Sequence, residues 1–188
     1  LNFCTVDLSA FYFDIRKDTL YCDPKISEKR KNCIQVLEII LESLLSWFAP
    51  ILSFTTEEIF KLINKEKNES IHLKQFAKIP KSWRNEKLNE KWLTIKKIRE
   101  ASNISIESKR SEKLIGSSLE AQINIKLNKE LYEIAKNYDF AEICITSGSE
   151  ISIDNNSNNE IKVETFKAEG EKCKVCWKIN KGKCERHG

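Results

Sequence analysis

Apolar residues in the first part of the chain recur every three to four positions, which is the spacing of one face of an α-helix. Residues 1–21 carry a broad apolar face of this kind, and Pro24 follows shortly after it. Ser27 then precedes a second stretch with helical spacing over residues 28–48, and Pro50 cannot continue that helix. We therefore predict two helices, each ending just before a proline.

Three further segments complete the helical part of the chain. Thr55 stands three residues before Glu58, which is the spacing of a capping box, and this pair predicts a short helix over residues 56–63. Residues 64–83 mix polar side chains with scattered apolar ones and are interpreted as a connecting loop. A longer helix is predicted over residues 88–107. One side of it carries Trp92, Ile95, Ile98, Arg99 and Ser102.

After Gly116 the apolar period changes from the helical value to two, as a half-buried strand requires. The alternating apolar residues are Ala121, Ile123, Ile125 and Leu127. We predict a short helix over 131–138, strands over 140–146, 150–154 and 161–167, and a turn over 155–159. The fold class is therefore mainly α, with a helical bundle over residues 1–111, a small α+β unit over 112–168 and a cysteine-rich tail over 169–188.

The tail contains the most specific motif in the sequence, a C-x2-C pair followed after seven residues by C-x2-H. Its candidate metal ligands are Cys173, Cys176, Cys184 and His187. Two-residue gaps let each pair turn back onto one ion, and thiolate and imidazole groups fill the tetrahedral shell of zinc. We predict one structural zinc ion in a zinc knuckle, because so short a segment cannot form a core of its own.

Two other interpretations of this tail are weaker. The cysteines can be free thiols near a chain end. A catalytic Cys184–His187 pair is disfavoured, because the sequence offers no third group to orient the histidine as a base.

Charge indicates what the knuckle binds. Residues 167–188 hold seven basic and three acidic side chains, against a net charge of +4 for the whole chain. An exposed aromatic ring within a basic surface suits single-stranded RNA, because phosphates are attracted and bases stack on the ring. The candidate RNA-binding residues are Trp177, Lys174, Lys178, Lys181, Lys183 and Arg186. The competing interpretations are that Trp177 packs over the metal site and that the lysines form a solvated surface.

Composition excludes several classes of function. The seven cysteines, an odd number, and the lack of a signal peptide argue against a secreted disulfide framework and favour a reducing cytoplasm. With five glycines and two histidines, no phosphate-binding glycine loop or Ser-His-Asp set is recognisable. His72, the histidine outside the tail, is expected on the surface. A basic run over residues 96–113 is diluted by glutamates. Because the sequence lacks methionine and opens with Leu1 inside an apolar pattern, we expect it to begin within a longer protein.

Several motifs now resemble those of one family. Residues 8–15 are similar to the first helix of the anticodon-binding bundle of class I synthetases for isoleucine, valine and leucine. Residues 49–60 resemble the turn and helix of the same bundle, with Ser53 in place of a usual proline and Thr56 in place of a usual alanine. Residues 107–110 and 115–121, and a tryptophan directly after the second tail cysteine, resemble the bacterial-type isoleucyl-tRNA synthetase family in particular.

This resemblance implies a function for the chain. The bundle and the zinc region of that family grip tRNA and read its anticodon, as part of an ATP-dependent ligase that attaches isoleucine. The catalytic signatures H-x-G-H and K-M-S-K-S are not in this sequence. We therefore expect no catalytic residues here, an inactive fragment on its own, and ATP binding and editing in a missing N-terminal part. The expected partners are isoleucine-accepting tRNA and that N-terminal part; the expected state is a cytoplasmic monomer.

The tail departs from the family pattern in two ways. The family has four cysteines and a longer span between the pairs, whereas this chain has His187 in the last position and a shorter span. Imidazole is a good zinc ligand, so the exchange preserves the chemistry. Two alternatives remain, a stand-alone zinc-knuckle RNA-binding or scaffolding protein and a fragment of the valine or leucine enzyme.

Overall fold

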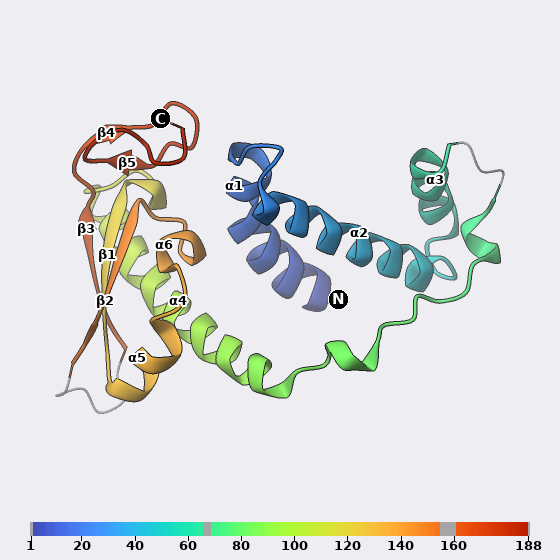
Figure 1. Cartoon of the computed structure of the whole chain (residues 1–188), viewed down its shortest axis with the longest axis horizontal. Helices are drawn as coiled ribbons and strands as arrows, with labels where there is room; N and C mark the ends of the chain where they lie inside the picture. Colours follow the sequence, from blue (N-terminus) through green and yellow to red (C-terminus); the bar gives the residue numbers. More distant parts are fainter. Residues whose placement is uncertain (1, 66–68, 155–160, 188) are drawn as a thin grey trace. The chain divides into compact units, whose positions relative to one another are not determined.

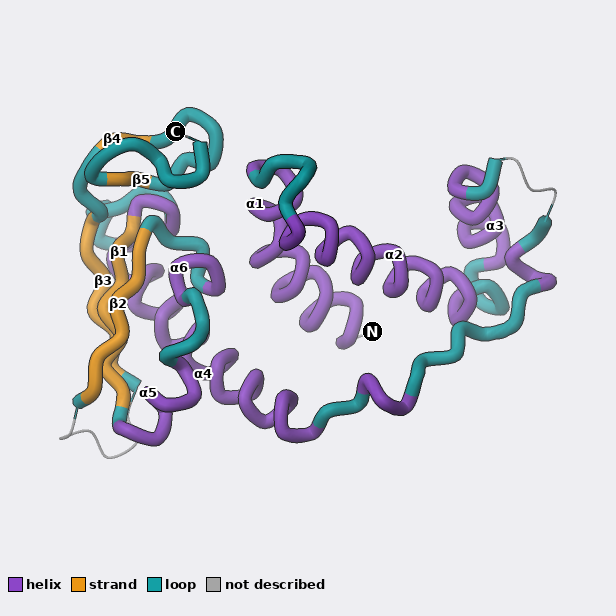
Figure 2. The backbone as a smooth tube through the Cα atoms, in the orientation of Figure 1, coloured by secondary structure: helices purple, strands orange, loops and turns teal. Residues whose placement is uncertain are grey.

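The computed structural model describes residues 2–65, 69–154 and 161–187. The chain forms two compact units, one made of residues 19–84 and the other of residues 1–18 with 85–188. Helices dominate and a small sheet follows them, so the mainly α fold with an appended sheet is confirmed (Figure 2). A division into compact units does not test where one domain ends and the next begins. The domain boundaries predicted at residues 111 and 168 therefore stay a prediction. No helix in the described ranges is long and apolar enough to cross a membrane.

The unit of residues 19–84 contains two helices and a long connection. Helix α2 (Glu28–Phe48) begins at Ser27, whose hydroxyl oxygen accepts a hydrogen bond from the backbone N–H of Arg30. Helix α3 (Ser53–Ile63) follows, and the connection contains two 3₁₀ turns, η2 (Ile71–Leu73) and η3 (Lys81–Trp83). The core of the unit consists of Leu45, Ala49, Phe60 and Ile71. The bounds predicted for α2 are confirmed, because a capped start and a following proline mark them locally.

The capping box predicted at Thr55 is wrong. Helix α3 begins at Ser53, two residues earlier, and its N-cap Leu52 makes no side-chain capping bond. The backbone N–H of Thr56 already donates to the carbonyl of Leu52 at 2.9 Å, so Thr55 lies inside the first turn. The Glu57 side chain caps a different segment: it accepts hydrogen bonds from the Ser70 hydroxyl at 2.8 Å and the Ile71 amide at 3.0 Å.

The other unit is built on a sheet whose described strands run in the order β2–β1–β3 (Figure 1). Strand β1 (Ala121–Leu127) pairs in parallel with β2 (Gly148–Ile153) and antiparallel with β3 (Lys162–Lys167). The predicted alternation of β1 is confirmed, since Ala121, Ile123, Ile125 and Leu127 are fully buried. Burying an aliphatic side chain of this size contributes about 1.5–3 kcal/mol.

Helix α4 (Glu86–Ser111) covers this sheet and contacts both β3 and β1. It is longer at both ends than predicted. Its start is set by Asn85, whose side chain caps the helix by accepting a hydrogen bond from the Leu88 amide. The predicted apolar side is confirmed, with Ile95, Ile98 and Ser102 buried. On the same helix the Ser105 hydroxyl donates to the Val163 carbonyl at 3.1 Å, which ties α4 to strand β3.

The segment before α4 in this unit is helical, as predicted, but in an unusual form. Residues Phe3–Phe13 form a π-helix, η1, which continues as helix α1 (Asp14–Cys22). It is held to α4 by a Lys96–Asp7 ion pair at 2.8 Å and by the Phe11 ring, which meets the Trp92 ring edge-on at 6.0 Å. Arg99 adds an ion pair to Asp14 at 2.9 Å.

The strand predicted over residues 140–146 is wrong. Residues Phe140–Ile143 form a short helix, α6, which follows helix α5 (Lys129–Ala135). Asp139 caps it by accepting from the Glu142 amide at 3.1 Å, and Phe140, Ile143 and Cys144 are buried at helical spacing. An apolar run this short fits either period, so only its packing against the sheet decides. The turn predicted over residues 155–159 lies outside the described ranges.

Glu57 provides a test of the connection in the residue 19–84 unit. The hydrogen bond and ion pair from Lys61, together with the Ser70 hydroxyl, lower the pKa of the Glu57 carboxyl. Because the folded state binds this proton less tightly than the unfolded chain, the stabilisation is complete above the unfolded pKa of about 4.3. It is lost as the pH falls through the folded value.

We expect Glu57→Gln to lower the thermal unfolding midpoint at pH 7 and to approach the parent midpoint as the pH falls below about 4. Scanning calorimetry over a pH series checks this. The control is Glu58→Gln, which changes an exposed neighbouring carboxylate on the same helix. Equal effects of the two substitutions at pH 7 would contradict the role of Glu57.

Candidate metal centre

The cysteine-rich tail forms a small hairpin with two loops. Strand β4 (Glu171–Lys172) pairs antiparallel with β5 (Ile179–Asn180), which sequence analysis had not predicted. In the first loop the Cys173 amide donates to the Lys178 carbonyl at 2.9 Å, so the chain folds back tightly around the C-x2-C pair. Gly170 has φ +129°, and a Cβ there would lie 2.1 Å from the Asn180 carbonyl oxygen. The hairpin therefore closes only with glycine at this position.

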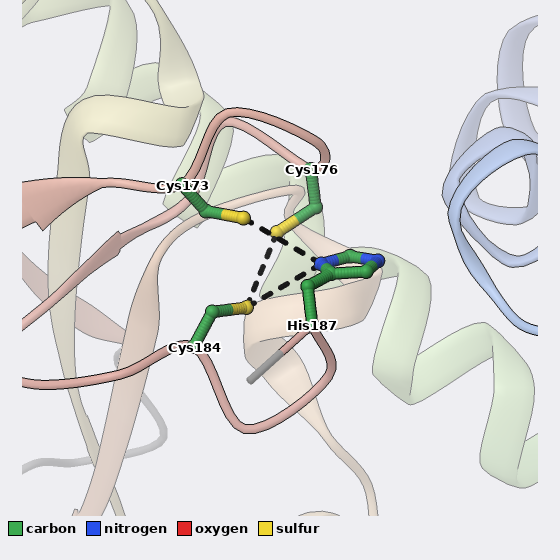
Figure 3. A group of neighbouring side chains, drawn as sticks. All are labelled: Cys173, Cys176, Cys184 and His187. Carbon is green, nitrogen blue, oxygen red and sulfur yellow. Dashed lines mark hydrogen bonds between the residues drawn. The ribbon is translucent and has the colours of Figure 1, made fainter.

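The four predicted metal ligands are brought together by these loops (Figure 3). Their ligand atoms all lie within 4.8 Å of one another. The His187 Nδ1 atom is 3.5 Å from the sulfur of Cys173 and 3.5 Å from that of Cys184. The sulfurs of Cys176 and Cys184 are 3.7 Å apart. Figure 3 shows the side chains of both loops pointing toward one another.

Three of these separations are those expected around a tetrahedral zinc ion. Zinc binds thiolate sulfur at about 2.3 Å and imidazole nitrogen at about 2.0–2.1 Å. In a tetrahedron of those radii, two sulfurs are about 3.8 Å apart, and a sulfur and a nitrogen are about 3.5 Å apart. The observed 3.7 Å and 3.5 Å separations match these values. The cluster can hold a metal ion, and its four protein ligands leave no position for a substrate.

The pKa values of the three thiols also favour metal binding. The backbone amides of Cys176 and Val175 donate to the Cys173 sulfur and lower its pKa to about 6. Burial opposes ionisation of Cys184, but hydrogen bonds from the Arg186 amide and from His187 bring its pKa below the ordinary value. Burial raises the pKa of Cys176 to about 11. Two thiols are thus held toward the metal-binding thiolate form, and the third needs a cation to replace its proton.

Trp177 stands directly after the C-x2-C pair in a strained conformation. Its φ is +63°, in the left-handed region that bulky residues rarely adopt. Its side chain is 59% exposed, and the Lys172 ammonium lies 5.7 Å from the ring centroid. Glycine would occupy this backbone position at lower cost. The Trp177 ring is therefore largely exposed at a strained backbone position.

The other predicted RNA-binding residues lie in or beside these loops and differ in how exposed they are. Lys174, Lys181 and Lys183 are exposed, whereas Lys178 and Arg186 are partly buried. Lys181 forms an exposed ion pair with Glu169 at 3.3 Å. The Lys178 carbonyl accepts the hydrogen bond that closes the first loop, so the backbone of this residue also stabilises the hairpin.

A serine that sequence analysis missed joins the hairpin to the sheet. The Ser147 hydroxyl donates to the Leu119 carbonyl and accepts from the Ile179 amide at 2.6 Å. The Ala168 amide also donates to the Glu120 carbonyl at 2.7 Å, at the start of the hairpin. No local pattern marks a serine for such a role, because its partners lie about thirty residues away in both directions.

Two residues outside the cluster show no sign of chemistry. Burial raises the pKa of the Cys144 thiol to about 11, so this cysteine is a core side chain and not a nucleophile. His72 is exposed, as predicted, and its Nε2 atom lies 3.3 Å from the Ser53 carbonyl.

Known proteins that resemble this chain agree on one family. A family model described as the anticodon-binding domain of tRNA ligase matches residues 1–125. An isoleucine–tRNA ligase of Pelagibacter ubique is 66% identical over 187 residues, which covers 100% of this chain and 20% of the relative. The isoleucine–tRNA ligase of Agrobacterium fabrum is 44% identical over 95% of this chain and 19% of its own length.

A third relative, the isoleucine–tRNA ligase of Bartonella henselae, is 47% identical over 81% of the chain and 16% of its own length. The chain thus spans about one fifth of the length of the relatives that match most of it. The resemblance to isoleucine enzymes that the sequence motifs predicted is confirmed. The family model covers more than half of the chain, and the chain therefore belongs to the anticodon-binding domain family of tRNA ligases.

Proposed function

We propose that this chain binds isoleucine-accepting tRNA and reads its anticodon as part of an isoleucine–tRNA ligase. Two relatives of that name match 95% or more of the chain, and the family model matches residues 1–125. Similarity along the whole chain favours this function over a stand-alone zinc-knuckle protein that binds RNA or acts as a scaffold. It also favours the isoleucine enzyme over the valine and leucine enzymes.

Ligation itself belongs, in this proposal, to the part of the relatives that the chain does not span. ATP binding, isoleucine activation and editing take place there, and this chain alone is inactive. Its own role is non-covalent, because a cluster with four protein ligands stabilises structure and offers no open coordination position. We propose that it acts in the cytoplasm, where thiols stay reduced, and as a monomer joined to the catalytic part.

We propose that the cluster binds one structural zinc ion. The support is the donor set of three thiols and one imidazole, together with three separations that match a zinc tetrahedron. The hairpin of residues 169–187 has Cys176 as its buried hydrophobic residue, so an ion would supply most of its folding free energy. It would act as a third module after a bundle of residues 1–111 and an α+β unit of residues 112–168.

RNA contact is proposed for the surface of this knuckle. Trp177 offers a stacking plate, and Lys174, Lys178, Lys181, Lys183 and Arg186 attract phosphates. The observation that carries this assignment is the strained backbone of Trp177, whose ring stays exposed at a position that suits glycine.

Zinc content tests the ligand assignment. We expect the parent chain to carry one zinc ion by native mass spectrometry and Cys176→Ser to carry none, because three ligands hold the ion far less tightly. Cys4→Ser changes a cysteine outside the cluster and should retain the ion. A zinc-loaded Cys176→Ser variant would contradict the assignment.

Two substitutions of Trp177 separate its ring from its backbone. We expect Trp177→Gly and Trp177→Ala both to weaken RNA binding by about 1–3 kcal/mol, because both remove the stacking ring. Trp177→Gly should be more stable than Trp177→Ala by about 1 kcal/mol, because glycine adopts positive φ without a Cβ clash. Filter binding and thermal unfolding of the zinc-loaded proteins check the two expectations. Unchanged RNA affinity with lower stability in both variants would make Trp177 a packing residue.

The function itself is tested by titrating the zinc-loaded chain against three RNAs. These are isoleucine tRNA, valine tRNA and an isoleucine tRNA with a swapped anticodon. We expect the tightest binding to the first and loss of that preference after the swap, measured by filter binding at two salt concentrations. Equal and steeply salt-dependent binding to all three would show a basic surface without anticodon recognition.

A further inference from the structure

A second feature of the sheet-containing unit, outside the knuckle, has the properties of an anion site. A surface cleft of about 550 Å³ lies where helix α4 ends and strand β1 begins. Its charged lining residues are Glu107, Arg110, Lys113, Glu120 and Lys167. Lys167 comes from the end of strand β3, far along the chain from the others, so only the folded sheet assembles this group.

The charged residues of the cleft sum to one net positive charge, since three cations face two carboxylates. Its two carboxylates both have partners: Glu107 pairs with Arg110 at 2.5 Å, and Glu120 accepts a hydrogen bond from the Gly116 amide at 2.9 Å. The ammonium groups of Lys113 and Lys167 form no ion pair or hydrogen bond with the described part of the chain. Both side chains are exposed. An open cleft with two free cations suits phosphate groups and offers little to an apolar ligand.

Lys113 occupies a backbone position that favours glycine. It is the second residue after helix α4, with φ +58°. The Leu114 amide donates to the Lys109 carbonyl at 3.1 Å and the Lys113 amide to the Arg110 carbonyl at 3.0 Å. This is the pattern of a Schellman motif, in which the left-handed residue is usually glycine. A lysine at this position carries a conformational cost that glycine would avoid.

Chain continuity and hydrogen bonds connect the cleft to the knuckle. Lys167 is followed by the short link that leads into strand β4 of the knuckle hairpin (Figure 1). The Ala168 amide donates to the Glu120 carbonyl, and Ser147 joins Leu119 to Ile179 of the hairpin. The cleft and the knuckle therefore lie at the same end of the sheet.

We propose that Lys113 and Lys167 bind phosphodiester groups of the same RNA whose bases the knuckle engages. This inference rests on the RNA-binding function proposed above and adds a backbone-binding site that sets the position of the RNA strand. Phosphate contacts position a nucleic acid, while contacts to bases distinguish its sequence. The cleft thus contributes affinity for any tRNA, and the knuckle loops are left to discriminate.

The test uses Lys113→Gly and Lys167→Gln in the zinc-loaded chain, titrated with isoleucine tRNA over a series of salt concentrations. We expect each variant to bind on the order of 5-fold more weakly and to lower the slope of log affinity against log salt by about 0.7–0.9. The control is Lys162→Gln, which removes a lysine on the same strand that is already paired with Asp154. It should leave affinity and slope unchanged.

Lys113→Gly allows a second measurement, of thermal stability, which should increase although RNA affinity decreases. Glycine relieves the left-handed strain, so the thermal unfolding midpoint should rise by about 2–4 °C while RNA affinity falls. A lysine with a merely structural role would not give this combination. If the parent binds tRNA and neither variant changes affinity or slope, the cleft is not a phosphate site, although the proposed function stands. If the parent chain does not bind tRNA at all, both proposals are wrong.

Discussion

The segment that ends this chain is too short to bury an apolar core, and this constraint governs the candidate site. A segment of that size needs a staple or a support. The four side chains whose candidate ligand atoms lie within 4.8 Å of one another could bind the ion that serves as a staple. The support comes from the Ser147 hydroxyl, which accepts from the Ile179 amide, and from the Ala168 amide, which donates to the Glu120 carbonyl. The support depends in turn on strand β1, whose buried side chains hold the sheet against helix α4. The position of the knuckle is therefore decided by a core to which it contributes almost nothing.

Two exposed residues of this unit, Lys113 and Trp177, have strained backbone conformations. Within the described ranges, the non-glycine residues with positive φ are Lys113, Ile145 and Trp177. Ile145 is 9% exposed, so burial of its side chain offsets the cost of its conformation. Lys113 and Trp177 are exposed and gain no such burial. Their side chains, a cation and an aromatic ring, are of the two kinds that bind phosphates and stack on bases, which is consistent with the RNA contacts proposed for them.

The family match and the metal centre cover different parts of the molecule. The anticodon-binding family model ends at residue 125, inside strand β1, whereas the candidate metal ligands begin at Cys173. The isoleucine–tRNA ligase relatives extend across both. The cleft at Lys113 and Lys167 has lining residues from both sides of that limit, because β3 returns alongside β1. A surface of this kind belongs to the folded unit and to no single motif.

Local regularities were sufficient for much of this structure. The sequence by itself determined helix α2, from a serine cap and a following proline, and strand β1, from alternation of apolar residues. It also indicated which cysteines and histidine gather in the tail, because a two-residue gap within each pair brings both side chains to one point. Its motifs identified the family, since their order along the chain is independent of packing.

Tertiary structure decided what depends on distant partners. The apolar run at residues 140–146 suits a strand or a helix, and packing against the sheet made it helix α6. Pairing of β1 with both β2 and β3, the role of Ser147 and the meeting of Lys113 with Lys167 each join residues far apart in the chain. Periodicity reports only which face of an element is apolar, whereas the partner of that face is chosen by the free energy of burying both surfaces together.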